Sequence, residues 1–191
     1  HKASLETQAT AQDLTNAITY DNKYQGDWGE EILSSLLSSF GFREGHEFDI
    51  QKQKKNESGE AFKPDVILHL PDDKDIVIDS KVSLKDYTNY IADPSNEEAL
   101  IKHVKSIETQ VRNISIKEYE NLEGVKTLDF IFVFIPIEGA LLCAYNYKQS
   151  LHSYALKKNV LLVSPSSLSM SLKLVNFMWQ TANQNKNSEE I

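Results

Sequence analysis

A run of eight consecutive apolar residues, FIFVFIPI at positions 130–137, constrains the fold of this chain more than any other feature. The run is far shorter than the roughly 18 apolar residues that a membrane-spanning helix needs, so we interpret it as a strand. Because neighbouring residues of a strand point to opposite faces, this strand is apolar on both faces. The run therefore predicts a central strand of a buried sheet.

The rest of the chain predicts the neighbours of that strand. The segment 46–82 indicates a meander of three strands with a turn at 71–73, and NVLLVSP at 159–165 indicates a fifth strand. We expect helices at 26–42 with Asp27 as N-cap, at 83–91, from 95 onwards with Ser95 or Asn96 as N-cap, and at 166–183. Residues 138–158 are ambiguous, with helix expected in their second half. This order predicts a mixed α/β domain with one central sheet flanked by helices.

Three segments are expected along the 191 residues. Residues 1–24 are polar with thinly spaced apolar positions, which favours a helical arm, the end of an upstream coiled coil. Residues 25–181 form the domain, and residues 182–191 read as a frayed polar tail. Since the chain begins with His1 and not Met, we expect it to be an excised fragment.

The amino-acid composition limits the cell compartment and the binding partners that suit this chain. The single Cys143 excludes an internal disulfide and fits a reducing compartment such as a bacterial cytoplasm, and its apolar neighbours favour a buried structural thiol. The net charge of −8 argues against a protein that coats DNA indiscriminately, although it does not exclude DNA. A basic cluster precedes the third strand, and it is either a solvated loop or a rim that contacts phosphates. It consists of Arg43, Lys52, Lys54, Lys55 and Lys63, and the four lysines are the expected DNA contacts.

Several acids occupy positions where a core pattern would not place them. Glu30 falls on the inner side of the first helix, Asp65 follows Pro64 at the start of a strand, and Asp79 shares a strand face with Lys81. Each has an ordinary explanation, such as a surface ion pair or a helix-end interaction. Burying several carboxylates together is costly unless they share a hard cation, and oxygen ligands suit Mg²⁺ or Mn²⁺.

These residues resemble the PD-(D/E)XK nuclease superfamily with its restriction-endonuclease-like core, in which an inward Glu, a Pro-Asp and an Asp-x-Lys follow one another. More narrowly, five motifs in order resemble the RmuC family of DNA recombination proteins. They are GDWGE at 26–30, KPDVILHLP at 63–71, DSKVSL at 79–84, FIPIEGA at 134–140 and LVSPSSL at 162–168.

The resemblance implies a role for each matching residue. Glu30, Asp65 and Asp79 would hold Mg²⁺ or Mn²⁺, with the backbone carbonyl of Ser80 as an additional ligand. Lys81 would orient or deprotonate the attacking water and offset charge on the transition state. Gln51 matches a glutamine of the family pattern and would hydrogen-bond within the site. Glu138, in FIPIEGA, would either cap the following helix or line the cleft.

The sequence therefore predicts a metal-dependent DNA nuclease that acts in recombination or repair. The alternative is a DNA-binding recombination factor that keeps the nuclease core but cleaves little or nothing, and a third interpretation is a scaffold that assembles partners through its arm. The expected partner is DNA, with self-association through the upstream coiled coil. We expect a cytoplasmic chain without membrane contact, although the resemblance implies a membrane anchor further upstream.

Overall fold

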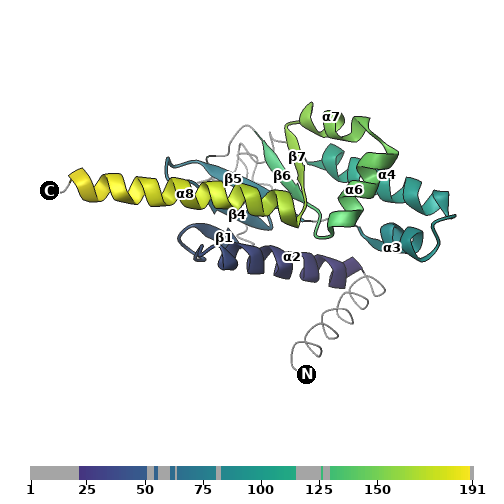
Figure 1. Ribbon diagram of the computed structural model, residues 1–191, viewed down its shortest axis with the longest axis horizontal. Helices are drawn as coiled ribbons and strands as arrows, with labels where there is room; N and C mark the ends of the chain where they lie inside the picture. The colour runs from purple at the N-terminus through teal and green to yellow at the C-terminus, as the bar shows by residue number, and fades with distance from the viewer. Residues whose placement is uncertain are drawn as a thin grey trace, which may run out of the picture.

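The computed structural model describes residues 22–50, 54–55, 61–62, 64–80, 83–114, 126 and 130–189. In these ranges helices cover both faces of a five-stranded sheet, which confirms the expected mixed α/β class (Figure 1). The sheet has the order β1-β4-β5-β6-β7 and consists of β1 (Phe48–Ile50), β4 (Val66–His69), β5 (Asp75–Asp79), β6 (Ile131–Phe134) and β7 (Val160–Val163). A small second sheet pairs β2 (Lys54–Lys55) with β3 (Ala61–Phe62). The helices are α2 (Asn22–Ser39), α3 (Lys85–Ala92), α4 (Glu97–Asn113), α6 (Glu138–Tyr147), α7 (Ser150–Leu156) and α8 (Pro165–Glu189).

β5 separates an antiparallel half of the sheet from a parallel half. β1, β4 and β5 form the predicted antiparallel meander, whereas β5, β6 and β7 run parallel. The turn between β4 and β5 is tight, because Leu70 N donates to Lys74 O at 2.7 Å and Asp73 adopts a φ of 61°. The parallel strands need crossover connections, and helices lie in both of them. The carboxyl ends of β5, β6 and β7 therefore meet along one edge of the sheet, which we call the carboxyl edge.

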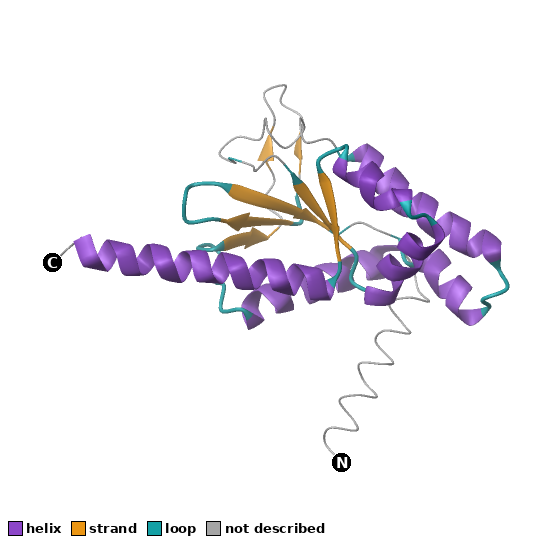
Figure 2. Cartoon of the chain, turned by 45° about the horizontal axis from the view of Figure 1, so that its top comes forward, coloured by secondary structure: helices purple, strands orange, loops and turns teal. Residues whose placement is uncertain are grey.

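Alternation along the strands divides the core into two clusters, one on each face of the sheet. Figure 2 shows the helices that cover the sheet. On the first face, strand residues such as Val77 pack with α4 and its neighbours. On the second, strand residues such as Ile78 pack with α2 and α8. We call these the α4 face and the α2 face. All four residues of β6 are buried, which confirms that the apolar run forms a strand covered on both sides.

Some helix ends lie where the sequence predicts them, and one does not. Gly41, with a φ of 82°, follows the end of α2 as predicted, because glycine adopts this left-handed conformation without strain. The N-cap of α4 is Asn96, whose side chain accepts a hydrogen bond from Ala99 N at 3.1 Å. The predicted cap Asp27 is wrong. α2 begins at Asn22 and Asp27 lies inside it, because none of the preceding residues breaks a helix strongly.

Three other expectations need correction. Residues 138–158 are helical in both halves, as α6 and α7. α8 continues to Glu189 through most of the segment expected to fray. Cys143, expected to be buried, is partly exposed on α6, although partial burial still raises the pKa of its thiol. The arm at 1–24 lies outside the described residues except for its last three positions. None of the helices in the described ranges is long and apolar enough to cross a membrane.

Candidate active site

Two buried aspartates face each other at the carboxyl edge. Asp79 is the last residue of β5, and Asp65 directly precedes β4. The antiparallel register pairs Val66 with Ile78, so the next step along the ladder places Asp65 opposite Asp79. Only 3% of Asp65 and 1% of Asp79 is exposed. Like charges opposite each other across two strands repel, so this pair needs local compensation.

Part of that compensation for Asp65 comes from Ser80, the residue after β5. The Oδ2 atom of Asp65 accepts hydrogen bonds from Ser80 N at 2.7 Å and from Ser80 Oγ at 3.1 Å. Ser80 is itself buried, so its N–H and hydroxyl groups would otherwise lack an acceptor. The bond fixes the path of the chain at the point where it leaves the sheet, immediately before Lys81.

Asp79 is held by a residue that the sequence interpretation missed. Gln110, on α4, donates a hydrogen bond from Nε2 to Asp79 Oδ2. This contact follows from strand alternation, because Asp79 has the same parity as Val77 and therefore points to the α4 face. Gln110 lies three residues after buried Ile107, on the inward side of α4. A polar residue at an inward helical position was the signal that could have identified it.

α2 brings Glu30 to the same edge from the other face of the sheet. Gly29 packs so closely there that an added Cβ would lie 3.7 Å from Pro136 Cγ and 3.9 Å from Ser80 O. Trp28 packs against the core of the α4 face, whereas Leu33 belongs to the core of the α2 face. The helix therefore crosses the carboxyl edge around Glu30, which is partly buried. Gln25 adds a second attachment, because its Oε1 accepts from Leu84 N at 3.1 Å.

The donors at this edge suit a hard cation in chemical type. Asp65 and Asp79 offer carboxylate oxygens, and the carbonyl of Ser80 lies between the sheet and α2. Across the described ranges, no three His, Cys, Asp or Glu side chains are placed to hold a metal ion together. The metal-binding role of Glu30, Asp65 and Asp79 therefore stays a prediction.

Several predicted site residues lie outside the part of the chain that the structure describes. These are Lys81, Gln51, Lys52 and Lys63, and for Lys54 and Lys55 only the backbone of β2 is described. β5 ends at Asp79, so the predicted strand face shared by Asp79 and Lys81 is described only as far as Asp79. The role of Lys81 and the basic rim remain expectations from the sequence.

Glu138 caps a helix, although not the helix to which it belongs. Its Oε1 accepts from Ser164 Oγ at 2.7 Å and its Oε2 accepts from Ser166 N at 3.1 Å, at the beginning of α8. The hydrogen bond from Ser164, with a further one from the Ser166 N–H, holds the pKa of Glu138 below its usual value. Glu138 thereby joins the carboxyl ends of β6 and β7, next to the aspartate pair in the sheet order.

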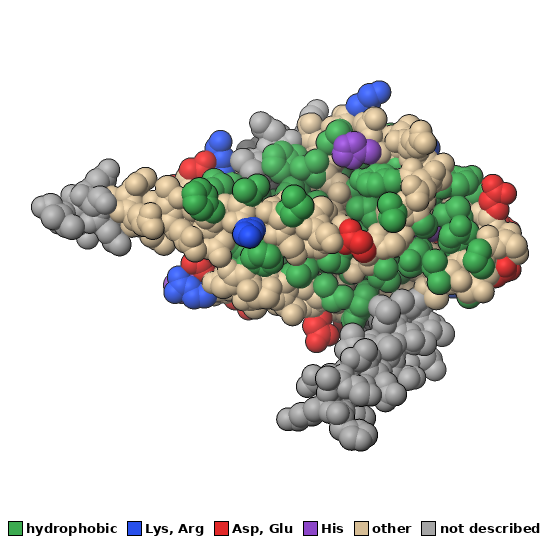
Figure 3. Space-filling view, in the orientation of Figure 1, with side chains coloured by type: hydrophobic (Ala, Val, Ile, Leu, Met, Phe, Trp, Pro, Cys, Tyr) green, Lys and Arg blue, Asp and Glu red, His purple; other side chains and the backbone are tan. Residues whose placement is uncertain are grey.

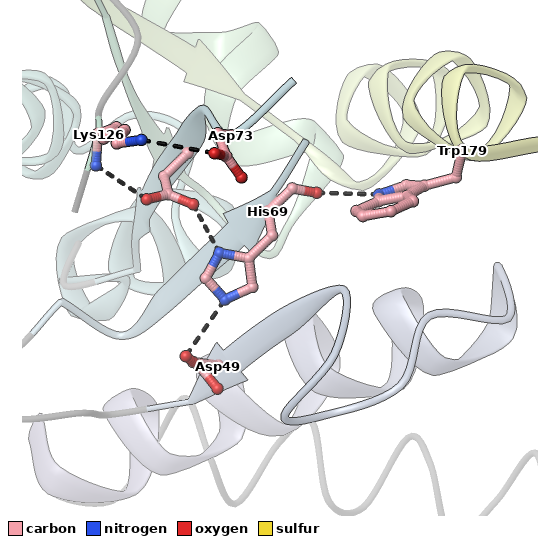
Figure 4. A network of polar contacts seen from close by, with 6 residues as sticks. Asp49, His69, Asp73, Lys126 and Trp179 are labelled. Atoms are coloured by element: carbon pink, nitrogen blue, oxygen red, sulfur yellow. Dashed lines mark hydrogen bonds and ion pairs between the residues drawn. The ribbon is translucent and has the colours of Figure 1, made fainter. Parts of the chain in front are cut away.

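A second polar cluster lies at the opposite edge of the sheet (Figure 4). His69 Nδ1 lies 2.6 Å from Asp75 Oδ1, and His69 Nε2 lies 3.2 Å from Asp49 Oδ2. The hydrogen bond to Asp75, followed by the interactions with Asp49, raises the pKa of His69. Trp179 of α8 donates from Nε1 to His69 O at 3.0 Å. A 440 Å³ pocket lies beside this cluster and includes Lys126 in its lining.

Comparison with known proteins finds relatives that match most of this chain. The DNA recombination protein RmuC of Escherichia coli K12 is 39% identical over 184 residues, which are 95% of this chain and 39% of that protein. The RmuC homologue of Vibrio cholerae is 39% identical over 95% of this chain and 36% of its own length. The Pseudomonas aeruginosa homologue is 40% identical over 98% of this chain and 42% of its own length.

The chain thus spans about two fifths of the length of these curated relatives. No solved structure matches it. The profile of the RmuC family matches residues 1–191, the whole of the sequence. On these matches, the chain belongs to the RmuC family.

Proposed function

We propose that this chain is a metal-dependent nuclease domain that hydrolyses phosphodiester bonds of DNA in recombination or repair. The observation that carries the proposal is the pair Asp65 and Asp79, two buried carboxylates opposed at the carboxyl edge. Two opposed buried acids repel each other, and this repulsion costs the sheet stability. A cation bound by both carboxylates, next to a phosphate substrate, would explain why the two acids lie together. The element order also supports the restriction-endonuclease-like core that the motifs imply.

In this proposal the acids of the carboxyl edge hold Mg²⁺ or Mn²⁺. Asp65, Asp79 and Glu30 provide carboxylate oxygens and Ser80 provides its backbone carbonyl. A cation held there would supply Lewis-acid chemistry to the phosphate and the attacking water. Gln110 keeps the Asp79 carboxylate in one orientation. Gln51, on the chain before Asp65, adds a hydrogen bond within the site.

Lys81 acts on the water and the phosphate. Its neutral amine takes a proton from the attacking water, whose oxygen forms a bond to phosphorus, and the amine thereby becomes an ammonium. The bond between phosphorus and the leaving deoxyribose oxygen breaks, and that oxygen receives a proton from solvent. The Lys81 ammonium offsets the negative charge that accumulates on the phosphate oxygens. Asp65 positions Lys81 indirectly, because it fixes Ser80.

DNA is the proposed substrate for two reasons. The curated relatives are named DNA recombination proteins, and the basic residues Lys52, Lys54, Lys55 and Lys63 precede or flank the strands that carry the acids. The first reason concerns proteins more than twice as long as this chain, so the substrate belongs to the proposal. Self-association through an upstream coiled coil is also part of it.

A specific observation favours a second function, binding of DNA without cleavage. Asp65 and Asp79 are both engaged by neighbouring groups, Ser80 and Gln110, which are the partners that a purely structural acid needs. No three-ligand metal group is present among the described residues. A recombination factor that kept this core for stability would show both features.

The test is a cleavage assay on single-stranded, duplex and branched DNA with Mg²⁺, with Mn²⁺ or with EDTA. We expect cleavage that depends on the divalent ion and persists through further purification. Asp79→Asn should abolish it by weakening metal binding, because a neutral amide is a poorer ligand than a carboxylate. Lys81→Ala should retain the metal and lower cleavage by about 10²-fold or more.

Glu108→Gln is the matched control, since Glu108 also lies on α4 but pairs with Lys148 away from the aspartates. This variant should cleave as well as the wild type. DNA binding without metal separates the two functions, because Asp79→Asn removes a charge that repels phosphate and so should hold or raise affinity. Wild-type chain that binds DNA but never cleaves it would establish the second function.

A further inference from the structure

The long C-terminal helix α8 carries two seams with the same spacing, which are apolar except for Thr181 in the outer seam. The inner seam repeats at intervals of four, three and four residues and packs on the α2 face, and it consists of Leu168, Leu172, Val175 and Trp179. The outer seam has the same intervals and consists of Met170, Leu174, Phe177 and Thr181. It is exposed to 72% at Met170, 67% at Leu174 and 66% at Phe177, and adjacent Met178 is exposed to 41%.

The outer seam forms an interrupted stripe of exposed hydrophobic side chains on the molecular surface. Hydrophobic side chains follow α8 on the face drawn in Figure 3. α8 also extends past the end of the sheet toward the C-terminus, so a second element can reach the stripe (Figure 1). Single exposed apolar residues are ordinary, but a stripe of several large ones on one helix face usually marks an interaction surface.

The spacing indicates that the partner is a helix. Intervals of four and three residues are the a and d positions of a heptad, which pack against another helix by knobs into holes. The charge of α8 further limits which helix can be the partner. Between positions 165 and 185 the only charged residue is Lys173, so the seam offers no charge pattern that would select an oppositely charged partner.

We propose that the outer seam pairs with the same seam of a second copy of this chain, in an antiparallel two-helix contact. A twofold interface requires a surface that is complementary to itself, and an uncharged apolar seam meets that requirement. The N-terminal segment, expected from the sequence to be helical, fits less well. The large aliphatic residues of positions 1–21 are Leu5, Leu14 and Ile18, whose intervals of nine and four do not form a seam of the same length.

The shape of the surface favours the antiparallel direction. A hollow of 400 Å³ lies at the C-terminal part of the seam, between the turn at Pro71 and the side chains of Phe177, Met178 and Thr181. In an antiparallel pair centred between Leu174 and Phe177, Met170 of the second copy lies opposite Thr181 and can fill the hollow. In a parallel pair each hollow would face the other and stay empty, which costs packing energy.

Sedimentation velocity of the complete chain over low to high micromolar concentrations tests the pairing. We expect a concentration-dependent shift from the mass of one chain to twice that mass. Phe177→Glu should weaken the dimer by at least about tenfold, because the interface would then bury an unpaired carboxylate. Leu142→Glu is the control, since Leu142 is 59% exposed on α6 and should leave the equilibrium unchanged. Circular dichroism and thermal melting verify that both variants fold.

Cysteine cross-linking tests the direction in a Cys143→Ser background. The double variant Met170→Cys, Thr181→Cys should form a covalent dimer on oxidation, whereas either single variant should not. Cross-linking of Met170→Cys alone overturns the antiparallel arrangement. A chain that stays monomeric at every concentration overturns the proposal, whether residues 1–21 or a different protein then cover the seam. The result does not depend on nuclease activity.

Discussion

At the residue scale, the two buried aspartates lie opposite each other but accept hydrogen bonds from different kinds of donor. Asp65 is tied to the backbone and hydroxyl of Ser80, which is local to the sheet edge, whereas Asp79 is tied to the side chain of Gln110 on α4. A backbone partner cannot be removed by substitution, but a side-chain partner can. Asp65 therefore fixes the path of the backbone at Ser80. The orientation of the Asp79 carboxylate, in contrast, can be changed by replacing Gln110.

Replacement of Asp65 should separate stability from activity. Asp65→Ala leaves the buried Ser80 N–H and hydroxyl without this acceptor, so we expect a loss of about 1–3 kcal/mol in the free energy of unfolding. Asp65→Asn keeps one acceptor oxygen and should lose less stability, yet it should lose cleavage as completely as the alanine variant. Urea denaturation measures the first effect and the cleavage assay measures the second. Equal stability of both variants would contradict the structural role of the Ser80 bond.

His69 should make stability depend on pH. Its pKa is raised in the folded state, chiefly by the hydrogen bond to Asp75, so the folded chain holds the proton more tightly than the unfolded chain. This contribution to stability is fully present below the unfolded pKa of about 6.5 and is lost as pH rises through the raised folded pKa. Urea unfolding between pH 6 and pH 9 should show the decline, and His69→Gln should remove it. Exposed His46→Gln is the control and should retain the decline.

At the element scale, the sequence predicted the parts that depend on local pattern. The apolar run gave β6, the meander gave the antiparallel pairing of β4 and β5, and that pairing by itself places Asp65 opposite Asp79. The contacts that depend on packing between distant elements were missed. Gln110 reaches Asp79 and Glu138 reaches the start of α8 only because helices and sheet come together. The helical period places Gln110 on the inward side of α4, but it does not name the partner of either residue.

Glu138 should stabilise the beginning of α8. Glu138→Ala removes the acceptor for Ser166 N and the negative charge near a helix N-terminus, so we expect a loss of about 0.5–2 kcal/mol in unfolding free energy. The pKa of Glu138 is lowered in the folded state, so its contribution is present above the unfolded pKa and is lost as pH falls through the folded pKa. Urea unfolding at pH 7 and in the acid range measures both effects. A Glu138→Ala variant with unchanged stability at pH 7 would show that Ser164 and Ser167 cap α8 without it.

At the scale of the whole molecule, the net charge of −8 and a DNA substrate are compatible only if the charges are segregated. The acids of the carboxyl edge repel phosphate, so binding needs a basic surface near them. Lys52, Lys54, Lys55 and Lys63 are the basic residues closest in sequence to β1 and β4, the strands on one side of the aspartate pair. Exposed Lys102 and Lys105 on α4 offer a different path for DNA.

Salt dependence of DNA binding should distinguish the two paths. Replacing Lys52, Lys54, Lys55 and Lys63 with glutamine should lower affinity in the absence of metal. It should also reduce the slope of log K against log salt by about one for each lysine that contacts a phosphate, because fewer counterions are released. Fluorescence anisotropy with labelled DNA between low and moderate salt measures both quantities. The matched control replaces Lys157 and Lys158, exposed residues after α7, and should leave the slope unchanged. If the fourfold variant keeps the wild-type slope and Lys102→Gln with Lys105→Gln reduces it, DNA follows α4 and not the segment between β1 and β4.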